Sequence, residues 1–176
     1  MSAIVIRPAT ANRWPRLRAI VWTLDIAVLL AALIAFASIP TGAPTAAGVA
    51  PPDGRVVVQQ AVGDASVLVV ARPETLQLLV AVHKQKGWFG LRVADTAPDG
   101  IAWASTGGAH GVPALSAVFG RAAGTTVRIR WSDGQETVAA VQSDGTFLGA
   151  RGGVERSIGV AILNGSGAIV RQVAGP

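Results

Sequence analysis

Hydrophobic positions in the C-terminal two thirds of the chain come in short runs rich in Val, Ile and Leu, separated by Gly, Pro, Asp and Asn. Several runs alternate apolar and polar residues, and a period of two is typical of strands rather than helices. The spacing predicts an all-β, antiparallel, sandwich-like domain over residues 55–176, with two small β subdomains divided near 106–116 as an option. The predicted strands are 55–62, 66–71, 76–83, 88–94, 101–105, 126–131, 136–142, 146–150, 157–163 and 168–173.

The clearest alternation is in residues 126–131, TVRIRW. One face of this strand carries Val127, Ile129 and Trp131, and the other carries two arginines. Because two arginines are seldom buried together, we expect the apolar face to lie in a two-layer β core and the arginines to face water.

Turn-forming pairs separate the later strands: Asp133-Gly134, Asp144-Gly145 and Asn164-Gly165. Gly accepts a positive φ, and Asp and Asn tolerate the left-handed region. Residues 73–83 also fit a short helix with Pro73 at its first position. The sequence Arg72-Pro73-Glu74 between two apolar runs favours a turn followed by a strand.

The N-terminal part has a different pattern, with an apolar stretch over residues 19–39 that contains a single charge. As a helix these residues would be about 30 Å long, enough to cross the hydrocarbon core of a bilayer. Four arginines precede this stretch, and none follows until Arg55. The asymmetry predicts a basic cytoplasmic segment at 1–18, a transmembrane helix at 19–39 and everything beyond outside the cytoplasm. Residues 40–54 are rich in Pro, Ala and Gly, and predict a semi-extended tether.

A cleaved export signal is the alternative for this segment. Residues 26–37 would form its apolar region, and Ala35-Phe36-Ala37 fits the small-residue pattern of a cleavage site. The region before the apolar core is long for a signal peptide, which favours a retained anchor. In both cases the β-rich domain is extracytoplasmic.

Asp25 is the single charge within the apolar stretch. It lies about 10 Å along a helix from Arg18, on nearly the same face, so it can reach the cytoplasmic interface. The alternative is a polar contact with the transmembrane helix of a partner.

Net charge and composition exclude several classes of function. The chain carries +5, but residues from 40 onward hold nine arginines and two lysines against six aspartates and three glutamates, a net charge of +2. That balance gives no basic field for nucleic acid. Cysteine is absent, which excludes disulfides, thiolate metal sites and a thiol nucleophile.

The strings HKQKGWFGLR (83–92) and AVFGR (117–121), the latter leading into VRIRW (127–131), resemble a group of bacterial single-span membrane proteins of unassigned function. In that group a small β-rich region is paired with a following sandwich-like region outside the membrane. The resemblance implies an architecture and a location, and no activity.

Two groups of residues are candidates for recognition. Trp88 and Phe89 are adjacent, so a strand would point them to opposite faces, one into the core and the other to a partner surface. The loop STGGAHGVP could present backbone N–H groups to an anion, or simply connect two strands. The candidate ligand residues of this loop are Ser105, Gly107, Gly108 and His110.

No catalytic, metal or cofactor pattern is recognisable. The chain has two histidines and lacks HExxH, GxSxG and SxxK. We therefore expect a structural or interaction module, not an enzyme, in contact with the bilayer through residues 19–39 and with a protein partner in the envelope. The alternatives are a cell-wall or small-ligand binding module and, third, an extracytoplasmic hydrolase.

Overall fold

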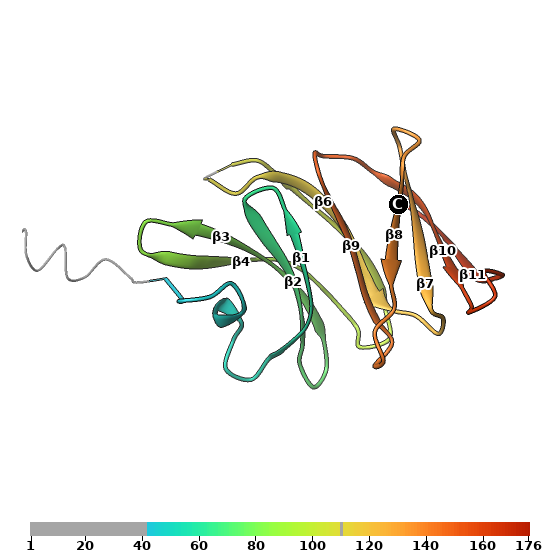
Figure 1. Cartoon of the computed structure of the whole chain (residues 1–176), viewed down its shortest axis with the longest axis horizontal. Helices are drawn as coiled ribbons and strands as arrows, with labels where there is room; N and C mark the ends of the chain where they lie inside the picture. Colours follow the sequence, from blue (N-terminus) through green and yellow to red (C-terminus); the bar gives the residue numbers. More distant parts are fainter. Residues whose placement is uncertain (1–41, 110) are drawn as a thin grey trace, which may run out of the picture. The chain divides into compact units, whose positions relative to one another are not determined.

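In the described part of the chain, eleven strands pair into three antiparallel sheets (Figure 1). The computed structural model describes residues 42–109 and 111–176. The predicted segments 1–18 and 19–39, with Asp25, and the candidate His110 lie outside the described residues. Within the described residues, no helix is both long enough and apolar enough to cross a bilayer.

The first sheet pairs strands that follow one another in the sequence, whereas the other two sheets also pair strands that are far apart in it. The first sheet has the order β1 (Arg55–Val62), β2 (Ala65–Ala71), β3 (Leu76–Lys84) and β4 (Gly87–Thr96). The middle sheet has the order β5 (Ile101–Gly107), β6 (Ala114–Arg121) and β9 (Thr146–Gly152). The third sheet has the order β11 (Ile169–Ala174), β10 (Ser157–Leu163), β7 (Thr126–Trp131) and β8 (Glu136–Ala140). The all-β, antiparallel, sandwich-like architecture predicted from the sequence is confirmed, and residues 73–83 contain β3 rather than a helix.

A first core fills the space between the first and middle sheets. Alternate residues of β2 and β3, among them Val67, Val69, Leu78 and Val80, pack against Phe119 of the middle sheet. All five side chains are fully buried. Strands β2 and β3 belong to this core through one face only.

A second core joins the middle sheet to the third. Trp131, Ile129 and Val127 of β7 are buried in it together with Val118 and Phe147 of the middle sheet. The predicted face of residues 126–131 is thus confirmed, with Arg128 and Arg130 exposed on the other side. The indole N–H of Trp131 donates a hydrogen bond of 2.8 Å to the Thr137 hydroxyl, which satisfies the one polar atom of this side chain.

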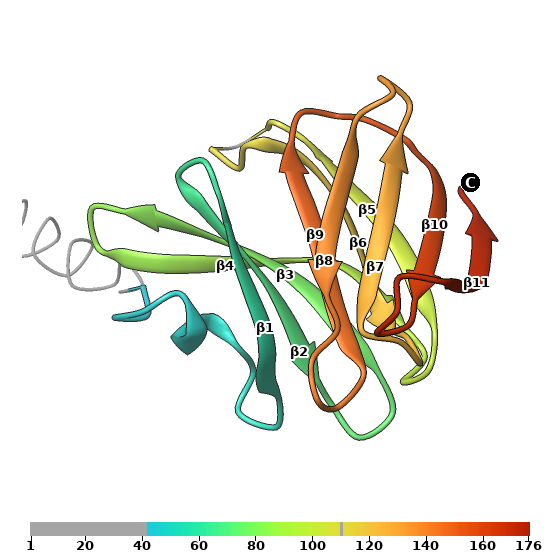
Figure 2. The same cartoon turned by 45° about the vertical axis from the view of Figure 1, so that its right-hand side comes forward.

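The middle sheet is therefore covered on both faces, and the structure has three layers where the sequence predicted two (Figure 2). Strand β6 has six consecutive buried residues and was not among the predicted strands. Strand β6 lacks the period-two signal because both of its faces are buried. Strands β2 and β3 are also buried on both faces but are richer in Val and Leu, whereas Ser116 and Gly120 interrupt the apolar run of β6.

The outer face of the first sheet is covered by the segment predicted to be a tether. A short 3-10 helix, η1 (Ala47–Val49), follows Ala46, which is 6% exposed and packs with Leu68, Val70 and Leu79. The described part of this segment, 42–54, thus packs against the sheet. The physical reason is that β2 and β3 are apolar on both faces, so their outer face also needs a cover.

The turns follow the predicted chemistry with one difference. Asp133 and Asp144 each accept a backbone N–H two residues ahead, with Gly134 and Gly145 at positive φ. In the β10–β11 turn, however, the residue at positive φ is Gly167 and not Gly165. The side chain of Asn164 accepts the N–H groups of Ser166 and Ala168 and so organises a longer loop than a two-residue Asn-Gly turn.

Residues 106–116 lie in the β5–β6 hairpin, where Thr106 pairs with Leu115 in a single sheet. Residues 41–176 form one compact unit with no division at that point.

Candidate functional site

The edges of two strands, β4 and β5, face a common cleft. Strand β4 ends the first sheet and β5 ends the middle sheet, and within residues 42–109 and 111–176 no backbone hydrogen bond joins them. Between them lies a cavity of about 530 Å³, which we call the edge cleft. It is lined by Val82, Lys84, Phe89, Gly90, Leu91, Arg92, Val93, Ser105, Thr106, Gly107, Ala109 and Val112.

The alternation of β4 sends Phe89 and Leu91 into the edge cleft and Trp88 to the opposite face. Leu91 is 47% exposed, and few other large apolar side chains of the described residues are as accessible to solvent. Trp88 packs beside Ala46 and meets the ring of His83 edge-on, with 5.2 Å between ring centroids. The two aromatics that were candidates for a partner surface thus lie on opposite faces, and of the two Phe89 lines the edge cleft.

The inner end of the edge cleft meets the first core. Val82 belongs to that core, and Val93 and Val112 pack against it. Thr106 is structural, because its hydroxyl donates to the Pro113 carbonyl at 2.6 Å and accepts the Leu115 N–H at 3.2 Å. The cleft floor is therefore apolar, and its shape is set by residues that also stabilise the fold.

The predicted Gly loop forms the turn of the β5–β6 hairpin. Gly108 and Gly111 have φ values of +75° and +77°, and Val112 donates its N–H to the Ala109 carbonyl. The glycines are explained by these backbone conformations. The structure brings Ser105 and Gly107 of this loop region to the same cavity as Phe89, which the sequence had not connected.

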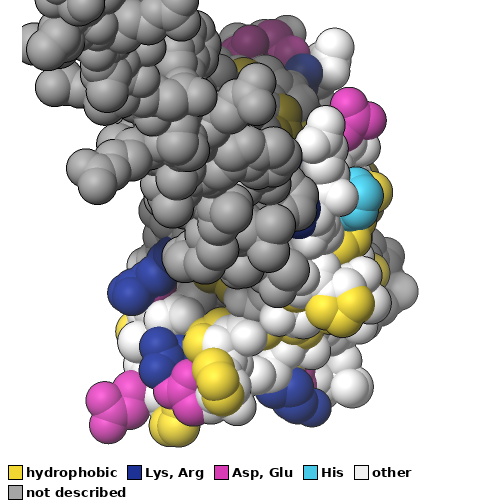
Figure 3. Space-filling view, turned by 90° about the vertical axis from the view of Figure 1, so that its left-hand side faces the viewer, with side chains coloured by type: hydrophobic (Ala, Val, Ile, Leu, Met, Phe, Trp, Pro, Cys, Tyr) yellow, Lys and Arg dark blue, Asp and Glu magenta, His cyan; other side chains and the backbone are white. Residues whose placement is uncertain are grey.

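The rim of the edge cleft is cationic. Lys84 and Arg92 line it, and no carboxylate does. Arg92 is paired with Asp95: its Nε–H donates a hydrogen bond of 2.9 Å to the Asp95 carboxylate, and this hydrogen bond raises the pKa of Arg92. Within the described part of the chain no carboxylate pairs with Lys84. Figure 3 shows one face of the described residues, on which basic, acidic and hydrophobic side chains are interspersed.

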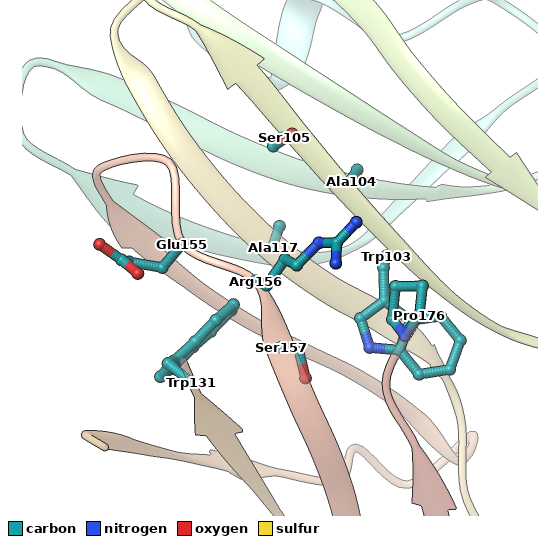
Figure 4. A pocket seen from close by; sticks show the side chains of 9 residues that line it. All are labelled: Trp103, Ala104, Ser105, Ala117, Trp131, Glu155, Arg156, Ser157 and Pro176. Carbon is teal, nitrogen blue, oxygen red and sulfur yellow. The ribbon is translucent and has the colours of Figure 1, made fainter. Parts of the chain in front are cut away.

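A second, smaller cavity of about 220 Å³ lies between the middle and third sheets, and we call it the tryptophan pocket (Figure 4). It is lined by Trp103, Ala104, Ser105, Ala117, Trp131, Glu155, Arg156, Ser157 and Pro176. The indole N–H of Trp103 is buried and has no hydrogen-bond partner among the described residues. In Figure 4 the Arg156 side chain extends toward Trp103, while the Glu155 carboxylate points away from it and accepts the Ser132 hydroxyl at 2.7 Å.

Sequence reasoning missed Lys84, Leu91, Trp103 and Arg156 as lining residues. Leu91 carried a usable signal, because it shares the strand face of Phe89 two positions earlier. The others depend on which sheets lie next to each other. Within the described residues no group of three or more His, Asp or Glu side chains is placed to hold a metal.

Comparison with protein-family models, curated proteins and solved structures finds no match to this chain. Its function has to be inferred from its own residues and their geometry.

Proposed function

We propose that this chain is a single-span membrane-anchored interaction module, whose β-rich domain binds a protein partner outside the cytoplasm and serves as an accessory part of an envelope or membrane complex. As a binding module it catalyses no reaction. The observation that carries the proposal is the edge cleft, an apolar cavity between the edges of β4 and β5. Within the described residues β5 pairs with no strand at this edge, and β4 pairs beyond β3 only at its beginning, where Trp88 bonds to Ala43. Proteins ordinarily cover or blunt such edges unless a partner completes them.

The size of the cavity supports binding here rather than at the tryptophan pocket. Ligand cavities commonly measure about 300–1,000 Å³. The edge cleft, at about 530 Å³, falls in this range, whereas the tryptophan pocket, at about 220 Å³, falls below it.

The proposed location of the β-rich domain outside the cytoplasm rests on the sequence, and two reporter fusions test it. A reporter fused after Pro176 should be active outside the cytoplasm, and one fused before Met1 should be active inside. A cytoplasmic C-terminus would overturn the proposal. N-terminal sequencing of the mature chain separates the retained anchor, which keeps residues 1–37, from the cleaved signal, which begins at Ser38.

The partner is tested by site-specific photocrosslinking in native membranes. A photoreactive residue at position 91 should capture one defined protein, and that protein, produced separately, should bind the purified full chain. Position 158 is the control, because Ile158 on β10 is 51% exposed against 47% for Leu91. The same products at both positions, or none at position 91, would contradict the proposal.

The second candidate is a cell-wall or small-ligand binding module, and the unpartnered Trp103 indole N–H favours it. A ligand bearing a hydrogen-bond acceptor would satisfy this buried donor, with Arg156 beside it. Trp103→Phe keeps an aromatic side chain, although a smaller one, and removes the N–H. If soluble cell-wall fragments bind the full chain, as measured by calorimetry, and the variant binds them at least about tenfold more weakly, this function replaces the first.

A further inference from the structure

The outer edge of β4 already accepts one strand-like partner from its own chain. The N–H and C=O of Trp88 both bond to Ala43, at 2.8 Å each. In an antiparallel ladder, residues whose backbone groups point away from one neighbour recur at every second position. The backbone groups of Gly90 and Arg92 therefore point the same way, up to the irregularity that follows Arg92.

The described part of the N-terminal segment packs Val49 against the face of Gly90 but makes no backbone hydrogen bond at these next positions. Gly42 donates to the Lys86 carbonyl, so residues 42 and 43 pair only with the beginning of β4. Within the described residues, no backbone hydrogen bond reaches the outward groups of Gly90 and Arg92. An extended segment lying there would satisfy these groups and continue the first sheet.

A strand added at this position would send alternate side chains into the edge cleft. Its inward side chains would share the face of Phe89 and Leu91, which line the cavity. Its other side chains would lie on the opposite face of the sheet, where Trp88 packs. The lining thus selects an apolar residue at every second position.

Charge adds a second requirement. Lys84 reaches across the cavity mouth, with its Nζ 3.8 Å from the position that a Cβ of Gly111 would take. No carboxylate lines the cavity, and Arg92 is already paired with Asp95. A carboxylate on the bound segment would complement Lys84, whereas a basic side chain there would be repelled by it.

We infer that the edge cleft binds an extended, acidic peptide segment of a protein partner by strand addition to β4 at Gly90 and Arg92, with apolar side chains at alternate positions in the cleft and a carboxylate at Lys84. The inference deepens the proposed function and rests on it. An anionic amphiphile such as a fatty acid would fill the same apolar space and also meet Lys84. It would leave the outward backbone groups of β4 without partners, so the peptide is the better complement.

The test uses the full chain in lipid nanodiscs and a display library of random heptapeptides. Selected peptides should alternate apolar residues and carry at least one Asp or Glu. A selected peptide is then synthesised, together with a copy N-methylated at the backbone positions of one edge and a second copy methylated at those of the other edge. One methylated copy should bind at least about tenfold more weakly and the other nearly unchanged, because an added strand uses only one edge.

Two variants with matched controls locate the site. Leu91→Asp places a charge in the cleft and should weaken binding at least about tenfold, whereas Ile158→Asp, at a similarly exposed site on β10, should not. Lys84→Glu should weaken binding of the acidic peptide and favour its Lys-substituted counterpart, whereas Arg171→Glu on the exposed strand β11 should do neither.

Three outcomes would overturn the inference. The first is selection of peptides in which apolar residues do not alternate with other residues. The second is an equal loss of affinity for both methylated copies. The third is that palmitate binds to the cleft and no peptide is selected. In the last case photocrosslinking at position 91 still tests the proposed function. A protein captured there while the purified chain selects no extended peptide would retain the function and reject strand addition.

Discussion

The side-chain amide of Gln60 in β1 makes two hydrogen bonds with the backbone of Ala150 in β9, ninety positions away in the sequence. Its Nε2 donates to the Ala150 carbonyl at 2.8 Å, and its Oε1 accepts the Ala150 N–H at 3.0 Å. Ala150 lies on the edge of the middle sheet that pairs with no strand. The glutamine thus completes that edge and joins it to the first sheet.

Gln60→Leu should destabilise the domain by about 1–3 kcal/mol, because it leaves a partly buried N–H and C=O without partners. Urea unfolding of a soluble fragment of residues 42–176 measures the change. Gln59→Leu is the control, because Gln59 is exposed and its amide makes only a 3.3 Å contact with Ser66. Equal losses for the two variants would contradict a specific role for the pair.

The N-terminal segment should be part of the folded unit. A fragment of residues 55–176 lacks the cover over Leu68, Val70 and Leu79, each at most 5% exposed in the structure. It should melt at a lower temperature than the 42–176 fragment and bind a hydrophobic dye. Identical melting curves without dye binding would show that residues 42–54 add nothing to stability.

Truncation of the second core should be costly. Trp131 is 1% exposed, and Trp131→Ala should lower the free energy of unfolding by about 3–5 kcal/mol or prevent folding. Arg130→Ala removes only surface contacts with Glu136 and should cost less than about 1 kcal/mol. Thermal melts of the two variants check this. An arginine variant as unstable as the tryptophan variant would contradict the face assignment.

Acid should weaken the fold partly through Asp144. The Thr146 backbone N–H is the main cause that lowers the pKa of this carboxyl below its ordinary value of 3.8, burial opposes it, and Arg121 and Arg55 assist. Because the folded pKa lies below the unfolded one, the stabilisation is present above about pH 4 and is lost as the pH falls through the folded pKa.

Asp144→Asn retains an oxygen acceptor and removes the charge. The variant should therefore lose less stability between pH 4 and pH 2 than the unmodified chain does, in unfolding curves recorded at each pH. Parallel pH profiles for the two proteins would exclude Asp144 as a source of acid lability.

The sequence predicted the orientation of strand side chains best where one face of the strand is exposed to solvent. The register of Val127, Ile129 and Trp131 against two arginines was readable because burial alternates there. It failed at β6, where Leu115 to Gly120 are all buried and no alternation exists. It also failed at Ala46, because a Pro/Ala/Gly-rich composition does not reveal that a nearby sheet has an uncovered apolar face.

The candidate site was predictable only in pieces. Phe89 and the residues Ser105 and Gly107 were each singled out from local sequence. Their meeting depends on β4 and β5 ending different sheets beside one cavity, and that is a property of the assembled sheets. Lys84 had no local signal at all, because its importance comes from the absence of acidic residues around the same cavity.

The middle sheet is buried on both faces, and this affects both the folding and the unfolding of the domain. The first sheet is a meander of consecutive strands, but its inner face is covered only once β9 has joined β6, with β7 and β8 lying between them in the sequence. A nascent chain that ends before residue 146 therefore lacks Leu148 and Ala150 of the first core and Phe147 of the second, so neither hydrophobic core is complete. Once assembled, the two cores share one wall, so heat or a cavity in either should melt both in a single calorimetric transition.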